Sequence, residues 1–211
     1  NQLEERDDIP LHALGFAVRD SEVCLMDDDG MTVLGEEVGE ICVKPLEPYV
    51  VFNGYFDDPQ ATHEAFFGDW YRTGDLGRRD GNTGALFFVD RKKDAIRYAG
   101  RNISTMEVES VVIRHPDVRE VAAFGIALAE VEGEHELKLN VVLQDGTHLT
   151  HEDLACFINE NAPHYFVPRY MEFVDSLPMT PTNKVQKFKL REAGIGPSTW
   201  DLKTSTYQVK R

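Results

Sequence analysis

The sequence lacks the charge balance and the long apolar segments that mark two large classes of protein. It contains 22 Lys and Arg residues against 37 Asp and Glu residues, which gives a formal net charge of −15 at pH 7. Because nucleic acids and acidic membrane surfaces attract basic proteins, this balance argues against both as partners. No run approaches the roughly 20 apolar residues of a membrane span, and residues 1–8 are acidic where a secretory signal is basic. The sequence therefore predicts a soluble, cytoplasmic protein.

Cysteine and histidine do not occur in the patterns that bind metals. The three cysteines, Cys24, Cys42 and Cys156, show no C-x-x-C spacing. Their odd number and wide separation argue against a disulfide framework and against a zinc site, and fit a reducing cytoplasm. His148 and His151 lie close together, but the sequence contains no H-E-x-x-H pattern. We therefore predict no metal site built from side chains of this chain.

What is present is an ordinary globular composition. With 211 residues, of which 42% are hydrophobic, the chain can bury one sizeable core or two small ones. Between residues 15 and 44, short apolar runs alternate with turn signals, which predicts β-hairpins in a small sheet or barrel. The runs cover residues 16–18, 23–26 and 40–43. Residues 45–85 are richer in Gly, Pro, Asp and aromatic residues and predict a long loop system with a short helix at residues 59–66.

The composition changes where the apolar strand at residues 86–89 runs into the charged segment 90–94, and we place a domain boundary there. Beyond it, Ser104-x-x-Glu107 and Thr150-x-x-Asp153 are helix-start signals. The predicted elements are a helix over 105–114, strands over 118–128 and 136–144, a helix over 151–161 and a strand over 170–174. The order of these elements is that of a compact α+β domain. The sequence thus predicts two domains, residues 1–90 and 91–211.

The first candidate for chemistry is the segment Asp69-Trp-Tyr-Arg-Thr-Gly-Asp75. Gly74 permits a close backbone approach, and the carboxylate of Asp75 offers two oxygens that can accept the hydroxyl groups of a ribose. The alternative interpretation is a plain turn, in which the Asp side chain bonds its own backbone. Spacing alone favours the turn.

Two further candidates are basic. The segment 90–94 and the following Gly100-Arg-Asn-Ile103 carry several charges at the predicted domain junction, where a solvated linker is the alternative. The segment 177–187 is a proline-stiffened polar loop that presents Lys184, for which solvated surface is the alternative. Taken separately, none of these segments identifies a function.

Together, in this order and at these separations, the segments resemble the C-terminal part of adenylate-forming enzymes, the superfamily of acyl-CoA synthetases, adenylation domains and luciferases. Five segments carry the resemblance. They are Gly39-Glu-Ile41, the G-Y-x-x-x-P-x-x-T segment 54–62, the W-x-x-T-G-D segment 70–75, the D-R-x-K-D-x-I segment 90–96 with Gly100 and Glu107-Val-Glu109, and the lysine loop that ends at Lys184. Residues 90–104 are most similar to carnitine or crotonobetaine CoA ligases and fatty-acyl CoA ligases.

The resemblance implies a fold and an activity. Residues 1–90 would be the last β-rich part of a large N-terminal adenylating domain, and residues 91–211 the small, mobile α+β C-terminal domain. The enzyme would be an acid–thiol ligase that converts a carboxylic acid and ATP to acyl-AMP and pyrophosphate, and then passes the acyl group to coenzyme A. An adenylation enzyme that loads a carrier protein, and a non-catalytic module of the same fold, are the alternatives.

The resemblance also assigns roles to residues. Asp75 would hold the ribose hydroxyls of ATP, and Arg91 would contact the ribose or a phosphate. Lys93 would be the hinge about which the C-terminal domain rotates. Gly100 and Arg101 would lie in the loop that faces the pantetheine of coenzyme A. Lys184 would reach the carboxylate and the α-phosphate, where its charge offsets the negative charge that builds up during adenylation.

The sequence departs from the family pattern at two positions. In the family, the residue before the lysine that corresponds to Lys184 is usually Gly. Here it is Asn183, and asparagine tolerates a left-handed backbone better than most residues. Some relatives carry a Lys implicated in the second half-reaction at the position of Arg97. Arginine keeps the charge but has a different geometry and does not readily lose its proton.

The family's phosphate-binding loop and its adenine- and Mg²⁺-binding segment do not occur in these 211 residues. In the family both lie upstream, together with the acyl pocket. The sequence therefore predicts a fragment whose missing partner is the N-terminal part of the same polypeptide, which would also hold the Mg²⁺ ligands. We expect the fragment alone to form no acyl adenylate, because fixed backbone N–H groups and a metal hold the triphosphate.

Overall fold

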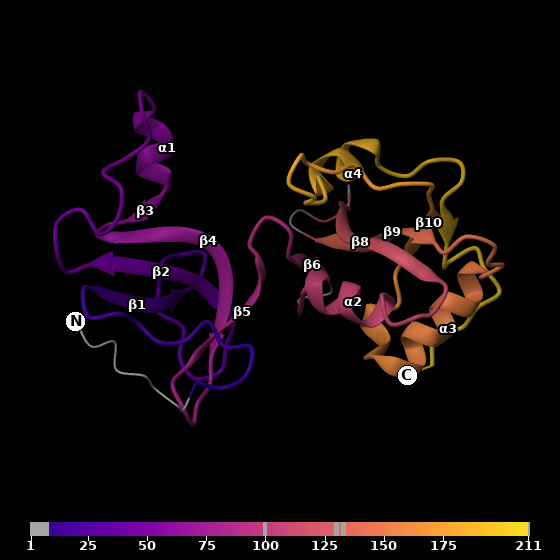
Figure 1. Cartoon of the computed structure of the whole chain (residues 1–211), viewed down its shortest axis with the longest axis horizontal. Helices are drawn as coiled ribbons and strands as arrows, with labels where there is room; N and C mark the ends of the chain where they lie inside the picture. The colour runs from indigo at the N-terminus through magenta and orange to yellow at the C-terminus, as the bar shows by residue number, and fades with distance from the viewer. Residues whose placement is uncertain (1–8, 99–100, 129–130, 132–133, 211) are drawn as a thin grey trace. The chain divides into compact units, whose positions relative to one another are not determined.

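The computed structural model describes residues 9–98, 101–128, 131 and 134–210. The chain divides into two compact units, residues 1–93 and residues 94–211, called unit 1 and unit 2 below. The division falls inside the charged segment 90–94. Each unit has its own sheet (Figure 1).

Unit 1 is built on an antiparallel five-stranded sheet in which β1, β2, β4 and β3 are neighbours in this order and β5 pairs with β4. The elements are β1 (Ser21–Met26), β2 (Gly39–Pro45), α1 (Pro59–Glu64), β3 (Phe66–Phe67), β4 (Trp70–Arg79) and β5 (Leu86–Arg91). The buried apolar cluster is small and is formed by Leu25, Ile41 and Leu86, with Val23 and Val33 packed against them. Met26, Cys42 and Ala85 are also buried. Unit 1 therefore depends on backbone pairing and on polar side chains as well as on apolar burial.

Two expectations for unit 1 are wrong. Residues 16–18 form no strand, although Gly15 makes an isolated bridge to Leu86. The supposed loop system 45–85 contains the ten-residue strand β4, which lies between β2 and β5. Its Gly, Asp and Arg residues are typical of loops, but pairing on both sides holds the segment extended. The short helix is confirmed as α1, which Asp58 caps by accepting a hydrogen bond from the N–H of Ala61 at 2.9 Å.

Unit 2 is an α+β domain, as the sequence predicted. Its four-stranded sheet has the order β11, β10, β9, β8, and β6 pairs with β7 in a separate hairpin. The elements are β6 (Ile96–Tyr98), β7 (Arg101–Ile103), α2 (Thr105–Val112), β8 (Val118–Ala127), β9 (His135–Leu143), α3 (His151–Asn161), the 3₁₀ turn η1 (His164–Phe166), β10 (Tyr170–Phe173), α4 (Lys187–Ala193) and β11 (Trp200–Asp201). Strands β8 and β9 are antiparallel neighbours, and β10 runs parallel to β9.

Both predicted helix starts are confirmed. Ser104 caps α2 by accepting a hydrogen bond from the N–H of Glu107 at 3.3 Å. Thr150 and Asp153 form a reciprocal capping box at the start of α3. Helix α2 ends at Val112, two residues before the predicted end at residue 114.

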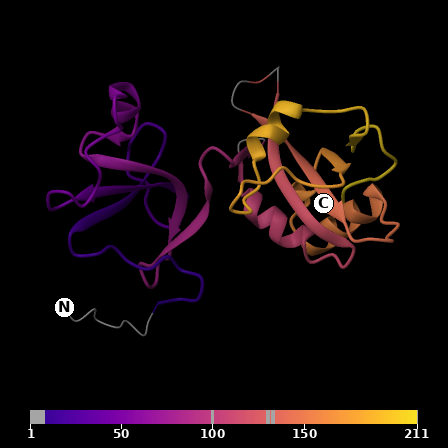
Figure 2. The ribbon, with the colours of Figure 1, turned by 45° about the horizontal axis from the view of Figure 1, so that its top comes forward.

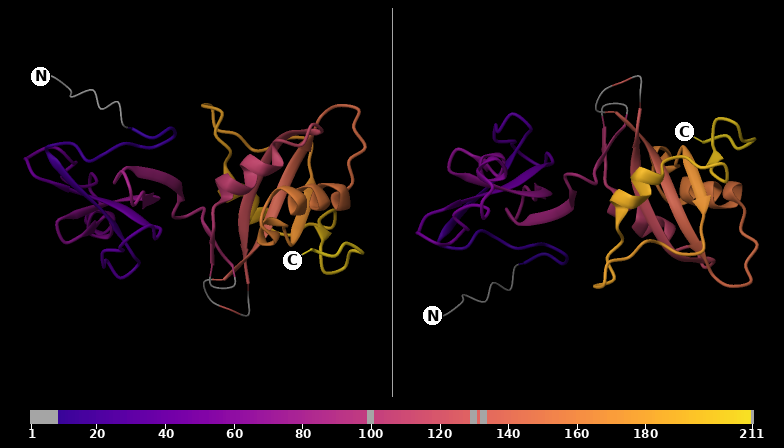
Figure 3. Two further views of the ribbon diagram at one scale, coloured as in Figure 1. Left: turned by 90° about the horizontal axis from the view of Figure 1, so that it is seen from below. Right: turned by 90° about the horizontal axis from the view of Figure 1, so that it is seen from above.

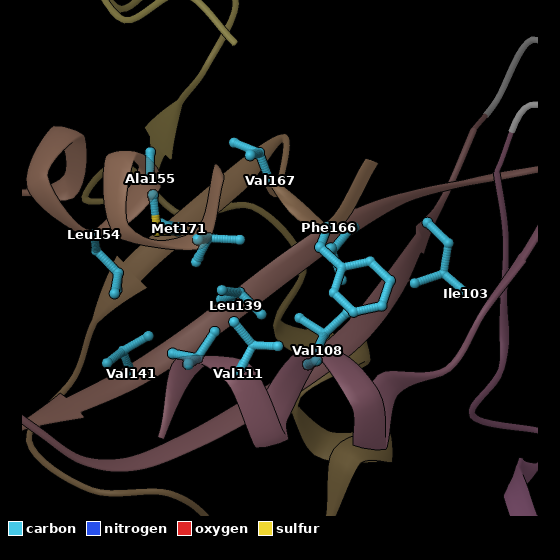
Figure 4. Packing of buried hydrophobic residues seen from close by; sticks show 14 of the residues in the cluster. Ile103, Val108, Val111, Leu139, Val141, Leu154, Ala155, Phe166, Val167 and Met171 are labelled. Carbon is cyan, nitrogen blue, oxygen red and sulfur yellow. The ribbon is translucent and has the colours of Figure 1, made fainter. Parts of the chain in front are cut away.

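The sheet of unit 2 is covered on both faces. Leu137, Leu139 and Val141 of β9 pack with α2 and α3, and Figure 4 shows Val108 and Val111 of α2 on this side of the strand. The alternate residues of β8 and β9 pack with α4 and its flanking loop, through Ala122, Phe124, Val142, Leu177 and Leu190. Helix α4 lies against these long strands (Figure 2 and Figure 3). Among the described residues, no helix is long and apolar enough to span a membrane.

Candidate functional site

Asp75 and Arg91 face each other on neighbouring strands of unit 1. They are directly opposite in the register of β4 and β5. The Nε of Arg91 lies 2.8 Å from Oδ1 of Asp75, and the side chains are 56% and 28% exposed. This contact is an ion pair without the alignment of a hydrogen bond, and Oδ1 has no hydrogen-bond donor among the described residues. Asp75 therefore keeps acceptor capacity, beside a cation that is exposed enough to move.

The backbone that carries Asp75 is fixed by its neighbours. Gly74 has a φ of +72°, which favours glycine at this position. The hydroxyl of Thr73 donates to the carbonyl oxygen of Ile41 at 2.8 Å and accepts from the N–H of Asp75 at 3.1 Å. The side chain that bonds the local backbone is thus Thr73, and the expected self-bonded turn at Asp75 gives way to an extended strand.

Glu40 organises this part of unit 1, a role that the sequence motifs did not predict. Its side chain is 2% exposed and accepts hydrogen bonds from three residues. The donors are Nη2 and Nε of Arg72 at 3.0 and 3.2 Å, Nζ of Lys92 at 2.8 Å and the N–H of Gly74 at 3.1 Å. Burial raises the pKa of Glu40, but the hydrogen bonds and charges of Lys92 and Arg72 outweigh it and lower the pKa below its usual value. Glu40 is therefore an anion that ties β2 to β4 and to the chain after β5.

The signal for Glu40 was present in the sequence as the middle residue of Gly39-Glu-Ile41. A carboxylate between apolar residues on a strand predicts a buried partner, but its cationic partners are 32 and 52 residues away along the chain. Local patterns could not have identified them.

The charged segment 90–94 is only partly a solvated linker. Lys92 is bound to Glu40 and also lies 2.7 Å from Oδ1 of Asp28. Burial lowers the pKa of Lys92, but the hydrogen bonds and charges of Asp28 and Glu40 raise it above its usual value overall. Lys93, the last residue of unit 1, is exposed.

An open hollow in unit 1 lies beside strand β4, next to Asp75. Its lining combines aromatic rings with cations, and includes Tyr55, Tyr71, Gly74, Arg91, Lys92 and Lys93. Since these residues include the sequence neighbour and the ion-pair partner of Asp75, the hollow lies directly beside this part of β4, and Glu40 and Glu64 also line it. A group of three or more His, Cys, Asp or Glu side chains that could hold a metal does not occur in the described part of the chain.

Lys184 lies in unit 2 on a short, hydrogen-bonded loop. The N–H of Thr180 donates to the carbonyl oxygen of Lys184 at 2.8 Å, and the hydroxyl of Thr180 accepts from the N–H of Lys184 at 3.0 Å. The side chain of Lys184 is exposed. Asn183 has a φ of +57°, so the position where relatives carry Gly is left-handed here. Asparagine adopts the conformation that the loop requires, which agrees with the expectation for this substitution.

The remaining predicted site residues also lie in unit 2, apart from Gly100, which is outside the described residues. Arg97 is on β6, with its Nε 3.7 Å from Oε1 of Glu134. Arg101 is exposed on β7, and its guanidinium lies over the ring of Tyr165 at 5.4 Å. The structure thus brings Asp75 and Arg91 together in unit 1, and places Arg97, Arg101 and Lys184 in unit 2.

Comparisons with known proteins agree with this arrangement. The family described as AMP-binding enzyme C-terminal domain matches residues 107–184. The chain is 39% identical over 191 residues to a long-chain-fatty-acid–CoA ligase of Escherichia coli O6:H1, covering 90% of this chain and 33% of the ligase. It is 36% identical over 156 residues to a crotonobetaine/carnitine–CoA ligase of Salmonella arizonae, covering 74% of this chain and 30% of that ligase.

Among solved structures, ATP-bound MatB from Rhodopseudomonas palustris matches with a TM-score of 0.76 at 29% identity, over 90% of this chain and 37% of MatB. The chain therefore spans about one third of the length of the relatives that it matches. These matches confirm the resemblance on which the site residues were chosen. Residues 107–184 match the AMP-binding enzyme C-terminal domain family, and most of the chain is similar to part of a fatty-acid CoA ligase and of a carnitine CoA ligase.

Proposed function

We propose that the chain is the C-terminal part of an ATP-dependent acid–CoA ligase. In this reaction the carboxylate attacks the α-phosphate of ATP and pyrophosphate leaves. The thiol of coenzyme A then attacks the acyl carbon, and AMP leaves. The observation that carries the proposal is the exposed Lys184 on a hydrogen-bonded loop, at the end of the segment that matches the AMP-binding enzyme C-terminal domain family. Both co-substrates belong to the cytoplasm, where we place the reaction.

In the adenylation step each site residue supplies a charge or a hydrogen bond. Asp75 accepts hydrogen bonds from the hydroxyl groups of the ribose, because Arg91 leaves its Oδ1 without a hydrogen bond. Arg91 turns toward the ribose or a phosphate. Lys184 offsets the negative charge that grows on the α-phosphate as the carboxylate attacks. Thr180 holds the backbone of Lys184 and so fixes the point from which its exposed side chain reaches toward the substrates.

For the thioester step we propose that unit 2 turns about Lys93, which withdraws Lys184 and presents Gly100, Arg101 and Arg97 to the pantetheine and the adenylate. Arg97 remains protonated and stabilises negative charge, but it does not act as a proton acceptor. The described residues supply no metal site, and the sequence contains no phosphate-binding loop. We therefore propose that the Mg²⁺ ligands and most of the triphosphate site belong to an upstream part of the same polypeptide.

The test is carboxylate-dependent exchange of pyrophosphate into ATP by the complete gene product. Lys184→Ala should lower exchange by about 100-fold or more, because it removes a charge that acts in the transition state. Lys189→Ala is the matched control, since it also removes an exposed lysine, five residues after Lys184. Short, branched and long-chain acids should be compared, because the acyl pocket lies outside this chain. Exchange by wild type that survives Lys184→Ala would contradict the proposed role.

Two further assays address the alternatives. Thioester formation should be measured with coenzyme A and with a carrier protein, because the acceptor separates a CoA ligase from a carrier-loading enzyme. Exchange should also be measured with the 211-residue chain alone, for which we expect none. A complete gene product that exchanges pyrophosphate with none of the acids would favour a non-catalytic module.

A further inference from the structure

Helix α4 begins three residues after Lys184, and both of its ion-paired basic side chains face the body of unit 2. Lys187 is the first residue of the helix, and its side chain is 14% exposed. Arg191 lies one turn later, and its side chain is 30% exposed. Because the lysine loop continues directly into α4, whatever holds this helix also holds the end of the loop.

Lys187 is bound by two residues of α2. Its Nζ lies 2.8 Å from Oε1 of Glu109 and donates to the hydroxyl of Thr105 at 2.8 Å. The same Oε1 of Glu109 accepts the N–H of Ala123 in β8 at 2.8 Å. Glu109 therefore fixes three elements, α2, β8 and α4, through one carboxylate. A charge-assisted contact with so little exposure is stronger than a surface ion pair.

Arg191, one turn further along the same face of α4, connects the helix to the start of unit 2. Its Nη1 donates to Oδ1 of Asp94 at 3.0 Å, and the Asp94 side chain is 16% exposed. Asp94 is the first residue of unit 2 and follows Lys93 directly. The residue after the proposed hinge is thus tied to the helix after Lys184, although the two partners are 97 positions apart along the chain.

Apolar side chains complete the attachment. Leu177 before the lysine loop and Leu190 in α4 are buried against Phe124 and Val142 on this face of the sheet, and Val185 packs against the same cluster. Apolar burial holds the segment on the sheet but is not directional. The two ion pairs set its position along the sheet, and with it the position of Lys184.

We propose that Glu109 and Asp94 are positioning residues for Lys184, because they clamp α4 so that the lysine loop and the residue after the hinge move as one rigid piece. The inference rests on the proposed function, since it assigns the clamp to the adenylation step. Lys184 acts in that step and is withdrawn in the next. Loosening the clamp should therefore slow adenylation and spare thioester formation.

The experiment compares the two half-reactions in variants of the complete gene product. Glu109→Gln keeps an acceptor for the N–H of Ala123 but removes the charge that holds Lys187, and Arg191→Gln removes the bond to Asp94. Each should lower pyrophosphate exchange by about tenfold or more, since small displacements of a reacting group cost up to about 100-fold. Thioester formation from supplied acyl-AMP should stay within about twofold. Lys189→Gln is the control, because it removes a charge from the same helix, and Lys189 has no ion pair among the described residues.

Rescue and folding distinguish positioning from general damage. The double variant Asp94→Arg with Arg191→Asp reverses the pair and should recover most of the exchange lost in Arg191→Gln. Equal loss in both half-reactions, or no loss in either, would overturn the clamp. If wild type shows no pyrophosphate exchange, the proposed function fails, but amide hydrogen exchange still tests the clamp. Arg191→Gln should then increase amide hydrogen exchange over residues 179–193. Unchanged protection of these amides would refute the clamp.

Discussion

Replacing Glu40 by Gln should destabilise unit 1 while leaving the shape of the side chain intact. The variant removes the negative charge between Arg72 and Lys92 but keeps an oxygen that accepts the N–H of Gly74. Removing one partner of a fully buried pair costs about 3–5 kcal/mol. The side chains of Arg72 and Lys92 are 26% and 29% exposed, so water replaces part of the lost interaction. We therefore expect a loss of about 2 kcal/mol in the free energy of unfolding of unit 1.

The two tryptophans allow unit 1 to be followed separately. Trp70 lies in β4 of unit 1 and Trp200 in β11 of unit 2, so fluorescence in a Trp200→Phe background reports on unit 1. Urea titration should show the midpoint lowered by about 1–2 M, from typical urea sensitivities of small domains. Asp28→Asn is the control, because Asp28 is 78% exposed and also pairs with Lys92. Similar midpoints for Glu40→Gln and this control would refute the argument that burial makes Glu40 the dominant partner.

The same variant predicts a pH dependence with a definite sign. Since the pKa of Glu40 is lowered in the folded state, its stabilisation is complete above the unfolded pKa of about 4.3. It is lost as the pH falls from there through the lower folded value. The difference in stability between wild type and Glu40→Gln should therefore shrink below about pH 4. A difference that stays constant down to pH 3 would contradict the assigned pKa direction.

Two further predictions concern unit 2, measured by Trp200 fluorescence in a Trp70→Phe background. Asn183→Ala should lower the stability of unit 2 by about 1 kcal/mol, because φ is +57° there, whereas Asn183→Gly should change it by less than about 0.5 kcal/mol; equal effects would contradict the left-handed loop. Burial lowers the pKa of His151, which stacks on Phe173 at 4.1 Å, and the charge of Glu152 opposes the shift only partly. The free energy of unfolding of unit 2 should therefore fall as the pH drops below about 6.5. His151→Phe should reduce the slope of this free energy against pH between about pH 5 and 7.5. Equal slopes for wild type and variant would contradict burial as the cause of the lowered pKa.

The elements that the sequence predicted correctly are those with local signals. Helices α2 and α3 begin at residues whose side chains cap the backbone, and β9 alternates apolar and polar residues along its length. Strand β4 was missed because its Thr-Gly-Asp core has the composition of a turn. The strand exists because β2 and β5 pair with it on both sides and because Glu40 binds the N–H of Gly74. Such support comes from residues far away in the sequence.

The polar face of β9 shows the same limit. The alternation placed Lys138 opposite the apolar face, where a lysine is normally solvated. In the structure Lys138 is 2% exposed and binds Glu172 at 2.7 Å and the carbonyl oxygen of Gly194 at 2.7 Å. The segment that covers it contains α4 and β11, which the sequence patterns did not predict. The burial of this lysine therefore depends on a tertiary contact that no local pattern encodes.

The charged segment 90–94 shows how neighbouring residues of similar type come to differ. Lys92 pairs with Glu40 within unit 1, whereas Asp94 pairs with Arg191 within unit 2. Lys93 lies between them, and its side chain makes no hydrogen bond or ion pair within the described part of the chain. A residue about which two units rotate must be tied to neither, while its neighbours must be tied firmly so that the change in backbone angle stays local. The arrangement of ion pairs on either side of Lys93 satisfies both requirements and is the structural basis on which we propose Lys93 as the hinge.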